Sequence, residues 1–520
     1  MKAFFNKLLG NTYTIKRAAT LLAVTALLSN VLGFLRNAIF YRTVSGPQLD
    51  IYFASFRLPD FIFNVLILGA ISSAFIPLLS GIVAKERETK AWEVSNQVLS
   101  CLTVVFAVVG IVMFVSMPWL MKLIVPGFDP TRFAESVIIS RILLLQSIFF
   151  AWSWTFGGIL NSFQRFASYA VAPLLYNISI IVGGFLAKDY GIRAIAWSVV
   201  VGAVFHMGIQ YLEVRKIGYK PRFNLKLSPE VKEVLSLMIP RSISLGMAQF
   251  VLIIFTMLGS GLMKSSIAVF SGLNDLQTTP TVIVANSLAV AFFPTITQYA
   301  AKKEWNEVSI LLTKVLRSCL FLLLPCVALA YLLRFQIITL YFSRDVSSST
   351  LTHLAVSTFA WFLVGIIPTA IVTLLARVFY SFKDTKTPLI LNIVGAVAGI
   401  LTAVIGIHVY HGEVPVLGMA NSVEDLVQVV LYIYLLYRLQ PMLLSLKTLG
   451  SKAALYILGC IIMTAVSWTF LHAFEQMGTN LVIQLCGTSI VAILTYYLYS
   501  KVIHTEELGW LQHNLSTKRR

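Results

Sequence analysis

Charged side chains interrupt the long apolar segments near the N-terminus of this chain. Arg36 lies inside the first apolar segment, Asp50 begins the second, and Arg57 follows two helical turns later. A charge at the centre of a bilayer costs about 2.5–3.5 kcal/mol on insertion scales, so such residues usually face a polar cavity or a partner. The two arginines and the aspartate therefore predict a water-filled, polar-lined cavity. The alternative is that each arginine only extends its charged end to the membrane surface.

Other acidic residues stand at unusual places in later apolar segments. Asp275 and the adjacent pair Glu424 and Asp425 join Asp50 as candidates for gating or for charge pairing with arginines. They could also bind a coupling cation, either sodium or a proton. The alternative for Glu424 and Asp425 is a polar helix end close to a loop.

The elements that must position these residues are membrane-spanning helices. The chain has 520 residues, of which 58% are hydrophobic and only 12% are charged, and its mean hydropathy is +0.83. These values indicate an all-α polytopic membrane protein. About fourteen apolar segments have the roughly 20 residues that a spanning helix needs. They cover about 17–41, 52–84, 94–125, 133–163, 167–187, 191–212, 231–261, 266–300, 307–342, 350–381, 387–409, 416–438, 453–474 and 479–503.

Basic residues set the expected orientation. The formal net charge is +18, which in a soluble protein would suggest nucleic-acid binding. Here most of the 40 Lys and Arg residues fall in loops on one side of the predicted spans. By the positive-inside rule that side is cytoplasmic, so we expect both termini there and no nucleic-acid partner.

The chain also repeats itself. Ala74–Pro77 resembles Ala291–Pro294, and Ser100–Leu102 matches Ser318–Leu320 at nearly the same offset. Because the period holds six predicted helices, we expect two six-helix lobes related by a pseudo-twofold axis along the membrane normal, followed by two extra C-terminal helices. The predicted divisions are 1–222 for the N-terminal lobe, 223–440 for the C-terminal lobe, and 441–520 for the last two helices and the tail.

Patterns for catalysis or metal binding are missing from the sequence. It contains no nucleotide-binding G-x-x-x-x-G-K-[ST], no H-E-x-x-H and no nucleophile elbow. The five cysteines fall in apolar runs without metal spacing, and His408 with His411 has no evident third ligand. We therefore expect a transporter with no cofactor and no metal site, rather than an enzyme.

The motifs resemble those of the MurJ (MviN) lipid II flippase family, within the multidrug/oligosaccharidyl-lipid/polysaccharide exporter superfamily. The resemblance extends over nearly the whole chain, and its main carriers are Ser29–Arg36, Asp50, Arg57–Pro59, Ala74–Pro77 and Phe379–Pro388. It implies export of a polyprenyl-pyrophosphate-linked cell-wall precursor, similar to lipid II, from the inner to the outer leaflet by alternating access. It also implies a bacterial inner membrane location, a role in peptidoglycan synthesis, and contact with membrane lipids and cell-wall synthesis enzymes.

The resemblance assigns the arginines a role. Arg36 and Arg57 match basic positions of the family and would bind the pyrophosphate headgroup, because the planar arginine fork binds phosphate oxygens in pairs. The family usually has arginine where this chain has Asn30 and Asp275. Arg141 and Arg241 are intramembrane arginines outside the family pattern, and they would compensate. For Arg241, which directly follows Pro240, the alternative is extension to the membrane surface.

Two other functions are compatible with the same sequence. One is a cation-coupled exporter of small molecules, or of another lipid-linked oligosaccharide, within the same superfamily. The other is a non-transporting membrane scaffold for cell-wall synthesis. If the chain is a flippase, the membrane potential is a further candidate energy source, because an inside-negative potential favours outward movement of anions.

Overall fold

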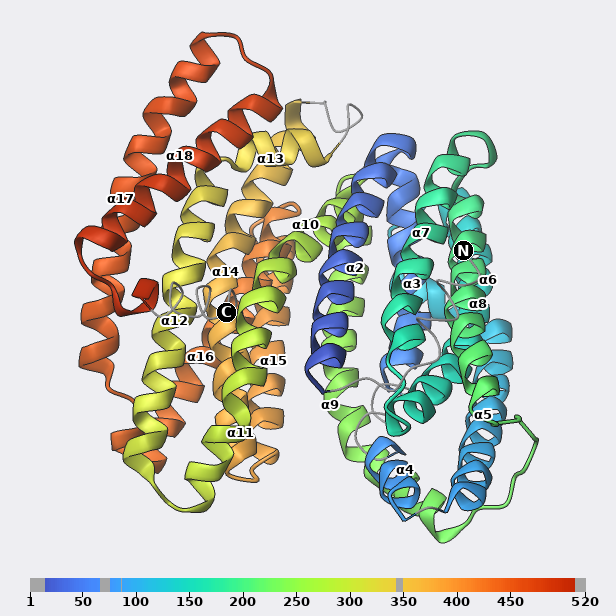
Figure 1. Ribbon diagram of the computed structural model, residues 1–520. Coiled ribbons are helices and arrows are strands. Elements are labelled where there is room, and N and C mark those ends of the chain that lie inside the picture. The colour runs from blue at the N-terminus through green and yellow to red at the C-terminus, as the bar shows by residue number, and fades with distance from the viewer. Residues whose placement is uncertain (1–14, 66–74, 86, 343–348, 510–520) are drawn as a thin grey trace. The chain divides into compact units, whose positions relative to one another are not determined.

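Helices make up all the regular structure that the computed structural model describes, which covers residues 15–65, 75–85, 87–342 and 349–509 (Figure 1). A helix satisfies every backbone hydrogen bond within one segment, which a chain in lipid requires. Twelve helices in these ranges are long and apolar enough to cross a membrane. The predicted all-α polytopic class is therefore confirmed, while the count of fourteen spans stays a prediction.

The chain divides into two compact units, Met1–Ala268 and Val269–Arg520. The helices of the first unit are α2 (Ile15–Thr43), α3 (Gly46–Phe63), α4 (Ile76–Val83), α5 (Glu88–Ile124), α6 (Pro130–Ser162), α7 (Ala167–Tyr190), α8 (Ile192–Lys216) and α9 (Pro229–Ser260). Helix α10 (Ser266–Thr281) begins in the first unit and continues into the second.

The second unit contains the remaining helices. They are the π-helical turn η3 (Val282–Asn286), α11 (Ser287–Ala301), α12 (Trp305–Leu332), α13 (Arg334–Tyr341), α14 (Ser349–Ser381), α15 (Lys386–His408), α16 (Pro415–Leu439), the 3₁₀ turn η5 (Pro441–Leu443), α17 (Leu446–Gln476) and α18 (Leu481–Val502). The predicted lobe boundary at 222/223 rests on a sequence repeat, whereas the contacts group α9 with the first unit. The repeat itself stays a prediction.

Helix α5 shows why these helices belong in lipid. Ile111, Val115, Trp119 and Leu123 recur every four residues, and each is at least 60% exposed. Residues four apart lie on the same helix face. This face is apolar along several turns, so hydrocarbon rather than water is its suitable surrounding.

Small residues let the helices of the first unit approach closely. Gly183 of α7 faces Ser198 of α8 so closely that a Cβ atom at this glycine would overlap the serine side chain. Gly202 of α8 lies against Tyr176 and Ser179 of α7 in the same way. Such contacts are the usual basis of helix packing in membranes. They fix the α7–α8 pair, which carries part of the candidate site.

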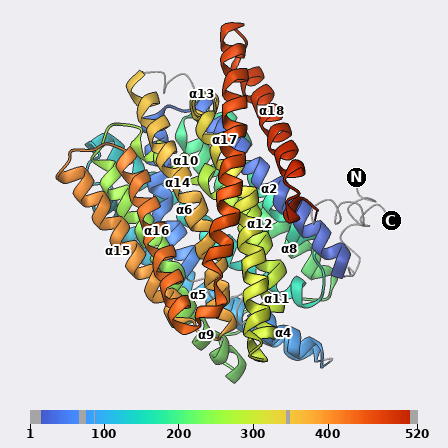
Figure 2. The same ribbon diagram turned by 90° about the vertical axis from the view of Figure 1, so that its left-hand side faces the viewer.

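In the second unit, α14 packs along α16, and α16 packs along α15. The last two helices form an antiparallel hairpin, red in Figure 2, and α17 lies beside α12. Phe321 of α12, Tyr456 of α17 and Tyr496 of α18 form part of a shared buried cluster. Near the end of α18, Arg317 of α12 makes an ion pair with Glu507, with 2.7 Å between the charged atoms.

The motif Phe379–Pro388 forms a tight turn between α14 and α15. The Asp384 carboxylate accepts hydrogen bonds from the backbone N–H groups of Lys386 and Thr387, each 3.0 Å long. Partial burial opposes ionisation, but the hydrogen bonds from Thr387 and Lys386 hold the pKa of Asp384 below its ordinary value. The aspartate thus stabilises the N-terminus of α15.

Candidate functional site

Arg36 is held by a polar network that joins α2 to α7. Its Nε donates to Oδ1 of Asn37 at 3.1 Å, and an Nη donates to Oδ1 of Asn177 at 3.3 Å. The amide nitrogen of Asn177 in turn donates to Oγ of Ser29 at 3.0 Å. An arginine within an apolar helix is therefore oriented by side chains on two helices.

A cavity of about 260 Å³ adjoins this network inside the first unit. Ser29, which belongs to the network, lines it together with residues of α2, α6, α7 and α8. The polar members of the lining are Thr25, Ser29, Asn30, Ser153, Tyr169, His206 and Gln210. The structure thus contains a polar-lined cavity within one unit, and this cavity shares Ser29 with the network of Arg36, which is not itself a lining residue.

Sequence reasoning missed the polar side chains that α6 and α8 contribute to this cavity. Nδ1 of His206 lies 2.6 Å from Oγ of Ser153, and both residues are buried. Oε1 of Gln210 is buried and has no hydrogen-bond partner. The signal that could have revealed them is a histidine and a glutamine one turn apart in the apolar segment of α8.

Arg57 lies on α3 and contacts α9. Its Nε donates to Oγ1 of Thr256 at 2.7 Å, and the side chain is half-buried. Arg36 and Arg57 thus lie in the same unit, and each is oriented by a hydroxyl or amide group from another helix.

Asp50 forms an ion pair with Arg132 rather than with one of the candidate arginines. It is 2% exposed, and one carboxylate oxygen lies 2.8 Å from an Nη of Arg132 at the start of α6. The backbone N–H groups of Ser265 and Ala268 donate to the same carboxylate at 2.7 and 2.8 Å. Asp50 therefore joins α3 to α6 and to the start of α10.

The other predicted arginines have separate surroundings. Arg141 of α6 donates from Nε to the backbone carbonyl of Phe114 at 3.0 Å, and its guanidinium stacks over the Phe114 ring. It also lines a second cavity, of about 310 Å³, between α5 and α6. Arg241 lies within α9, but its side chain is outside the described part of the structure. Arg141 is therefore held by α5 rather than by the network of Arg36.

The acidic candidates of the second unit differ from one another. Asp425 of α16 accepts a 2.5 Å hydrogen bond from Oγ1 of Thr369, which lies on α14. Gln277 of α10 reaches the same hydroxyl at 3.5 Å and accepts from Asn421 at 3.3 Å. These four residues form a polar cluster among three helices. Gln277 and Thr369 had no place in the sequence-based prediction.

Glu424 and Asp275 lie outside this set of hydrogen bonds. Glu424 packs against Gly399 of α15, and Asp275 is exposed on α10. Among the described residues, no group of three or more His, Cys, Asp or Glu side chains has an arrangement that could hold a metal ion. The polar side chains around Arg36 and Arg57 can form hydrogen bonds with a polar or anionic group and can stabilise its charge.

Comparisons with known proteins identify relatives of this chain. The model of the family described as lipid II flippase MurJ matches residues 43–487. A probable lipid II flippase MurJ from Rhizobium tropici is 26% identical over 517 residues, covering 94% of this chain and 95% of the relative. A lipid II flippase MurJ from Burkholderia cenocepacia is 26% identical, with coverage of 72% and 74%.

Solved structures agree on the fold. A lipid II flippase MurJ in an inward closed conformation matches with a TM-score of 0.78 at 20% identity, covering 93% of this chain and 99% of the other. An inward-facing MATE family multidrug transporter of the MOP superfamily matches with a TM-score of 0.67 at 15% identity, covering 82% of this chain and 98% of the other.

Proposed function

The chain belongs to the lipid II flippase MurJ family, and from that premise we propose that it moves lipid II from the inner to the outer leaflet. The observation that carries this proposal is the family match over residues 43–487. The probable lipid II flippase MurJ from Rhizobium tropici is matched over 95% of its own length. The chain acts as a transporter by alternating access and performs no covalent chemistry on the substrate.

The physical task is to carry a charged headgroup across lipid. The polyprenyl tail is stable in the bilayer, whereas the saccharide and about two negative charges on the pyrophosphate need a polar path. Arg36 and Arg57 are the proposed pyrophosphate ligands, because their guanidinium groups stay charged and are oriented by Asn177 and Thr256. The polar cavity beside Ser29 offers hydrogen-bonding groups to sugar hydroxyls.

Energy for export has two proposed sources. An inside-negative potential favours outward movement of an anion by about 2.3 kcal/mol per charge per 100 mV. The cluster of Gln277, Thr369, Asn421 and Asp425 could hold a sodium ion or a proton that couples to transport, since its oxygen atoms converge from three helices.

Location and partners follow from the same proposal. The protein would lie in the bacterial inner membrane with both termini in the cytoplasm, as the Lys/Arg distribution predicts. There it would receive lipid II from the enzymes that complete it and release it to the enzymes that polymerise peptidoglycan.

Complementation tests this function. In a strain with conditional depletion of its own lipid II flippase, the full-length chain should restore growth and exposure of the lipid II headgroup at the outer leaflet. An Arg36→Ala variant expressed at the same level should restore neither. If the wild-type chain left the headgroup inside, the exporter or scaffold alternatives would take the place of this proposal.

A further inference from the structure

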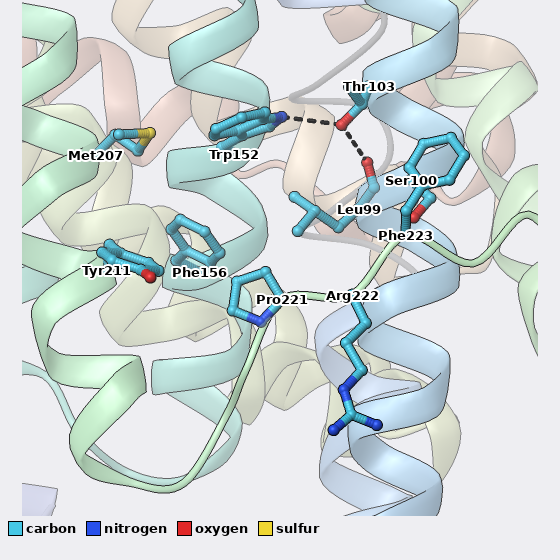
Figure 3. Close-up of a pocket in the computed structure, with 10 residues that line it drawn as sticks. All are labelled: Leu99, Ser100, Thr103, Trp152, Phe156, Met207, Tyr211, Pro221, Arg222 and Phe223. Atoms are coloured by element: carbon cyan, nitrogen blue, oxygen red, sulfur yellow. Dashed lines mark hydrogen bonds between the residues drawn. The ribbon is translucent and has the colours of Figure 1, made fainter.

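A cavity of about 330 Å³ lies in the first unit, separate from the polar cavity beside Arg36 (Figure 3). Its walls come from α5, α6, α8 and the segment that follows α8. The lining residues are Leu99, Ser100, Thr103, Trp152, Phe156, Met207, Tyr211, Pro221, Arg222 and Phe223. Small-molecule pockets in proteins range from about 300 to 1,000 Å³, so this one can hold part of a ligand such as one acyl chain.

The interior of the cavity suits a hydrocarbon. Figure 3 shows Trp152 donating to Thr103, and this hydrogen bond measures 2.9 Å. The Thr103 hydroxyl donates to the backbone carbonyl of Leu99 at 2.7 Å, and Ser100 accepts from the backbone N–H of Asn224 at 2.9 Å. Because these polar groups already have partners within the protein, the surface left for a ligand is mainly aromatic and aliphatic.

The segment that follows α8 carries a concentrated positive charge. Arg215 and Lys216 end α8, and Lys220, Arg222 and Lys226 follow it, with no acidic residue between positions 215 and 226. The Arg222 side chain is exposed at the mouth, and Figure 3 shows its guanidinium pointing away from the Trp152–Thr103 pair. An apolar interior with a basic mouth is complementary to a molecule that has a hydrocarbon chain and an anionic headgroup.

This segment is fixed to α5 by side chains that are buried in the protein. Asn96 accepts hydrogen bonds from the Tyr219 hydroxyl at 2.9 Å and from the backbone N–H of Arg222 at 2.8 Å. Gln97 accepts from the backbone N–H of Ser228 at 3.3 Å. Asn96 and Gln97 are 7% and 2% exposed. The basic mouth is therefore positioned by the fold.

Apolar side chains of the same segment are also exposed. Phe223, Leu225 and Leu227 alternate with polar residues and are 70%, 52% and 50% exposed. Exposed apolar side chains next to lysine and arginine are typical of a segment that lies in the membrane interface. Trp152 and Tyr211 are residue types that also favour this depth.

We propose that this cavity binds an anionic phospholipid of the surrounding leaflet, with one acyl chain between α5, α6 and α8 and the phosphate beside Arg222. The proposal does not depend on the transported substrate. One basic residue near an anionic membrane surface raises the binding affinity about fivefold, so loss of the Arg222 charge should have a measurable effect on lipid binding.

Native mass spectrometry of the purified full-length protein tests this site, with phosphatidylglycerol and phosphatidylcholine as probes. The wild-type protein should retain phosphatidylglycerol in preference to phosphatidylcholine. Arg222→Gln should weaken retention of phosphatidylglycerol about fivefold, because it removes the charge and keeps the backbone hydrogen bond to Asn96. Arg438→Gln is the matched control, because Arg438 is also exposed and lies near an aromatic ring, that of Tyr434. It should leave retention unchanged.

Photo-crosslinking locates the lipid. Phosphatidylglycerol with a photoreactive acyl chain should label peptides of α5, α6, α8 or residues 219–223, and Met207→Trp, which fills the cavity, should remove the label. Three results would overturn the proposal: equal retention of both lipids, equal effects of Arg222→Gln and Arg438→Gln, or labelling elsewhere. Displacement of the label by excess polyprenyl diphosphate would assign the cavity to the transported substrate and would also overturn it. Arg222→Gln keeps the test decisive if Met207→Trp does not fold.

Discussion

Arg36 lies on an apolar helix and donates hydrogen bonds to two side chains. Its guanidinium donates to Asn37 from Nε and to Asn177 from an Nη, at 3.1 and 3.3 Å. A planar fork can keep this orientation and still present other N–H groups to a phosphate. The ammonium of lysine is a point charge, so it would not reproduce the arrangement.

Arg36→Lys should therefore reduce headgroup exposure at least tenfold, since a hydrogen bond to a charged group contributes roughly 1.5–3 kcal/mol. Lys302→Ala, at an exposed position after α11, should be nearly silent. The measurement is lipid II exposure in flippase-depleted cells at matched expression. Full activity of Arg36→Lys would show that transport does not require the planar guanidinium group at this position.

Asp50 and Arg132 form an ion pair whose side chains are 3% and 13% exposed. Among the described residues of the first unit, this ion pair is the most deeply buried. Asp50→Asn would place an amide nitrogen among three donors and leave Arg132 without its counter-charge. Removing one partner of a buried pair costs about 3–5 kcal/mol. We expect a clear fall in the melting temperature of the detergent-purified protein.

The matched control for Asp50→Asn is Glu135→Gln. Glu135 also pairs with an arginine, Arg193, at 2.7 Å, but these side chains are 24% and 53% exposed. An exposed pair contributes about 0–1 kcal/mol, so this variant should melt nearly as the wild type does. Equal melting of the two variants would mean that burial does not set the strength of the Asp50 pair.

At the scale of helices, the sequence predicts where the helices lie along the chain better than which side chains pair between them. Most of the predicted apolar segments coincide with helices, because lipid leaves a spanning chain few other conformations. The predicted span 307–342 is instead divided into α12 and α13, and part of the predicted span 52–84 lies outside the described residues. The ion pair between Asp50 and Arg132 joins residues 82 apart in the sequence, and Arg132 lies in the first turn of a helix rather than inside an apolar run. Hydropathy carries no information about such a pairing. The same holds for Thr369 and Gln277 beside Asp425.

The hairpin of α17 and α18 has a charged contact with α12 close to its C-terminal end. Arg317 is 9% exposed and lies 2.7 Å from Glu507, which is 7% exposed. Arg317→Gln should increase hydrogen exchange at the end of α18, because Glu507 would lose its counter-charge.

Lys452→Gln is the control for the hairpin. Lys452 pairs with the exposed Glu506, at 3.7 Å, so exchange at residues 500–508 should change little. Equal protection in the Arg317→Gln and wild-type proteins would show that the buried aromatic cluster holds the hairpin without the ion pair.

At the scale of the whole molecule, the Lys/Arg distribution predicts opposite sides for two loops. Tyr410 follows α15 and is 78% exposed, and Lys226 lies in the basic segment after α8. In a background without the five native cysteines, a membrane-impermeant thiol reagent should label Tyr410→Cys in intact cells. Lys226→Cys should react only after the membrane is opened. Labelling of both from outside would contradict the proposed topology.

Transport by the purified chain is the most direct test of the account. Full-length protein in vesicles with fluorescent lipid II should move the headgroup to the opposite leaflet, and a potential negative on the side of departure should accelerate this movement. Arg36→Ala protein at equal density should move it no faster than protein-free vesicles do. Equal movement by the wild-type and Arg36→Ala proteins, or none by the wild type, would contradict the claim that this chain carries lipid II with Arg36.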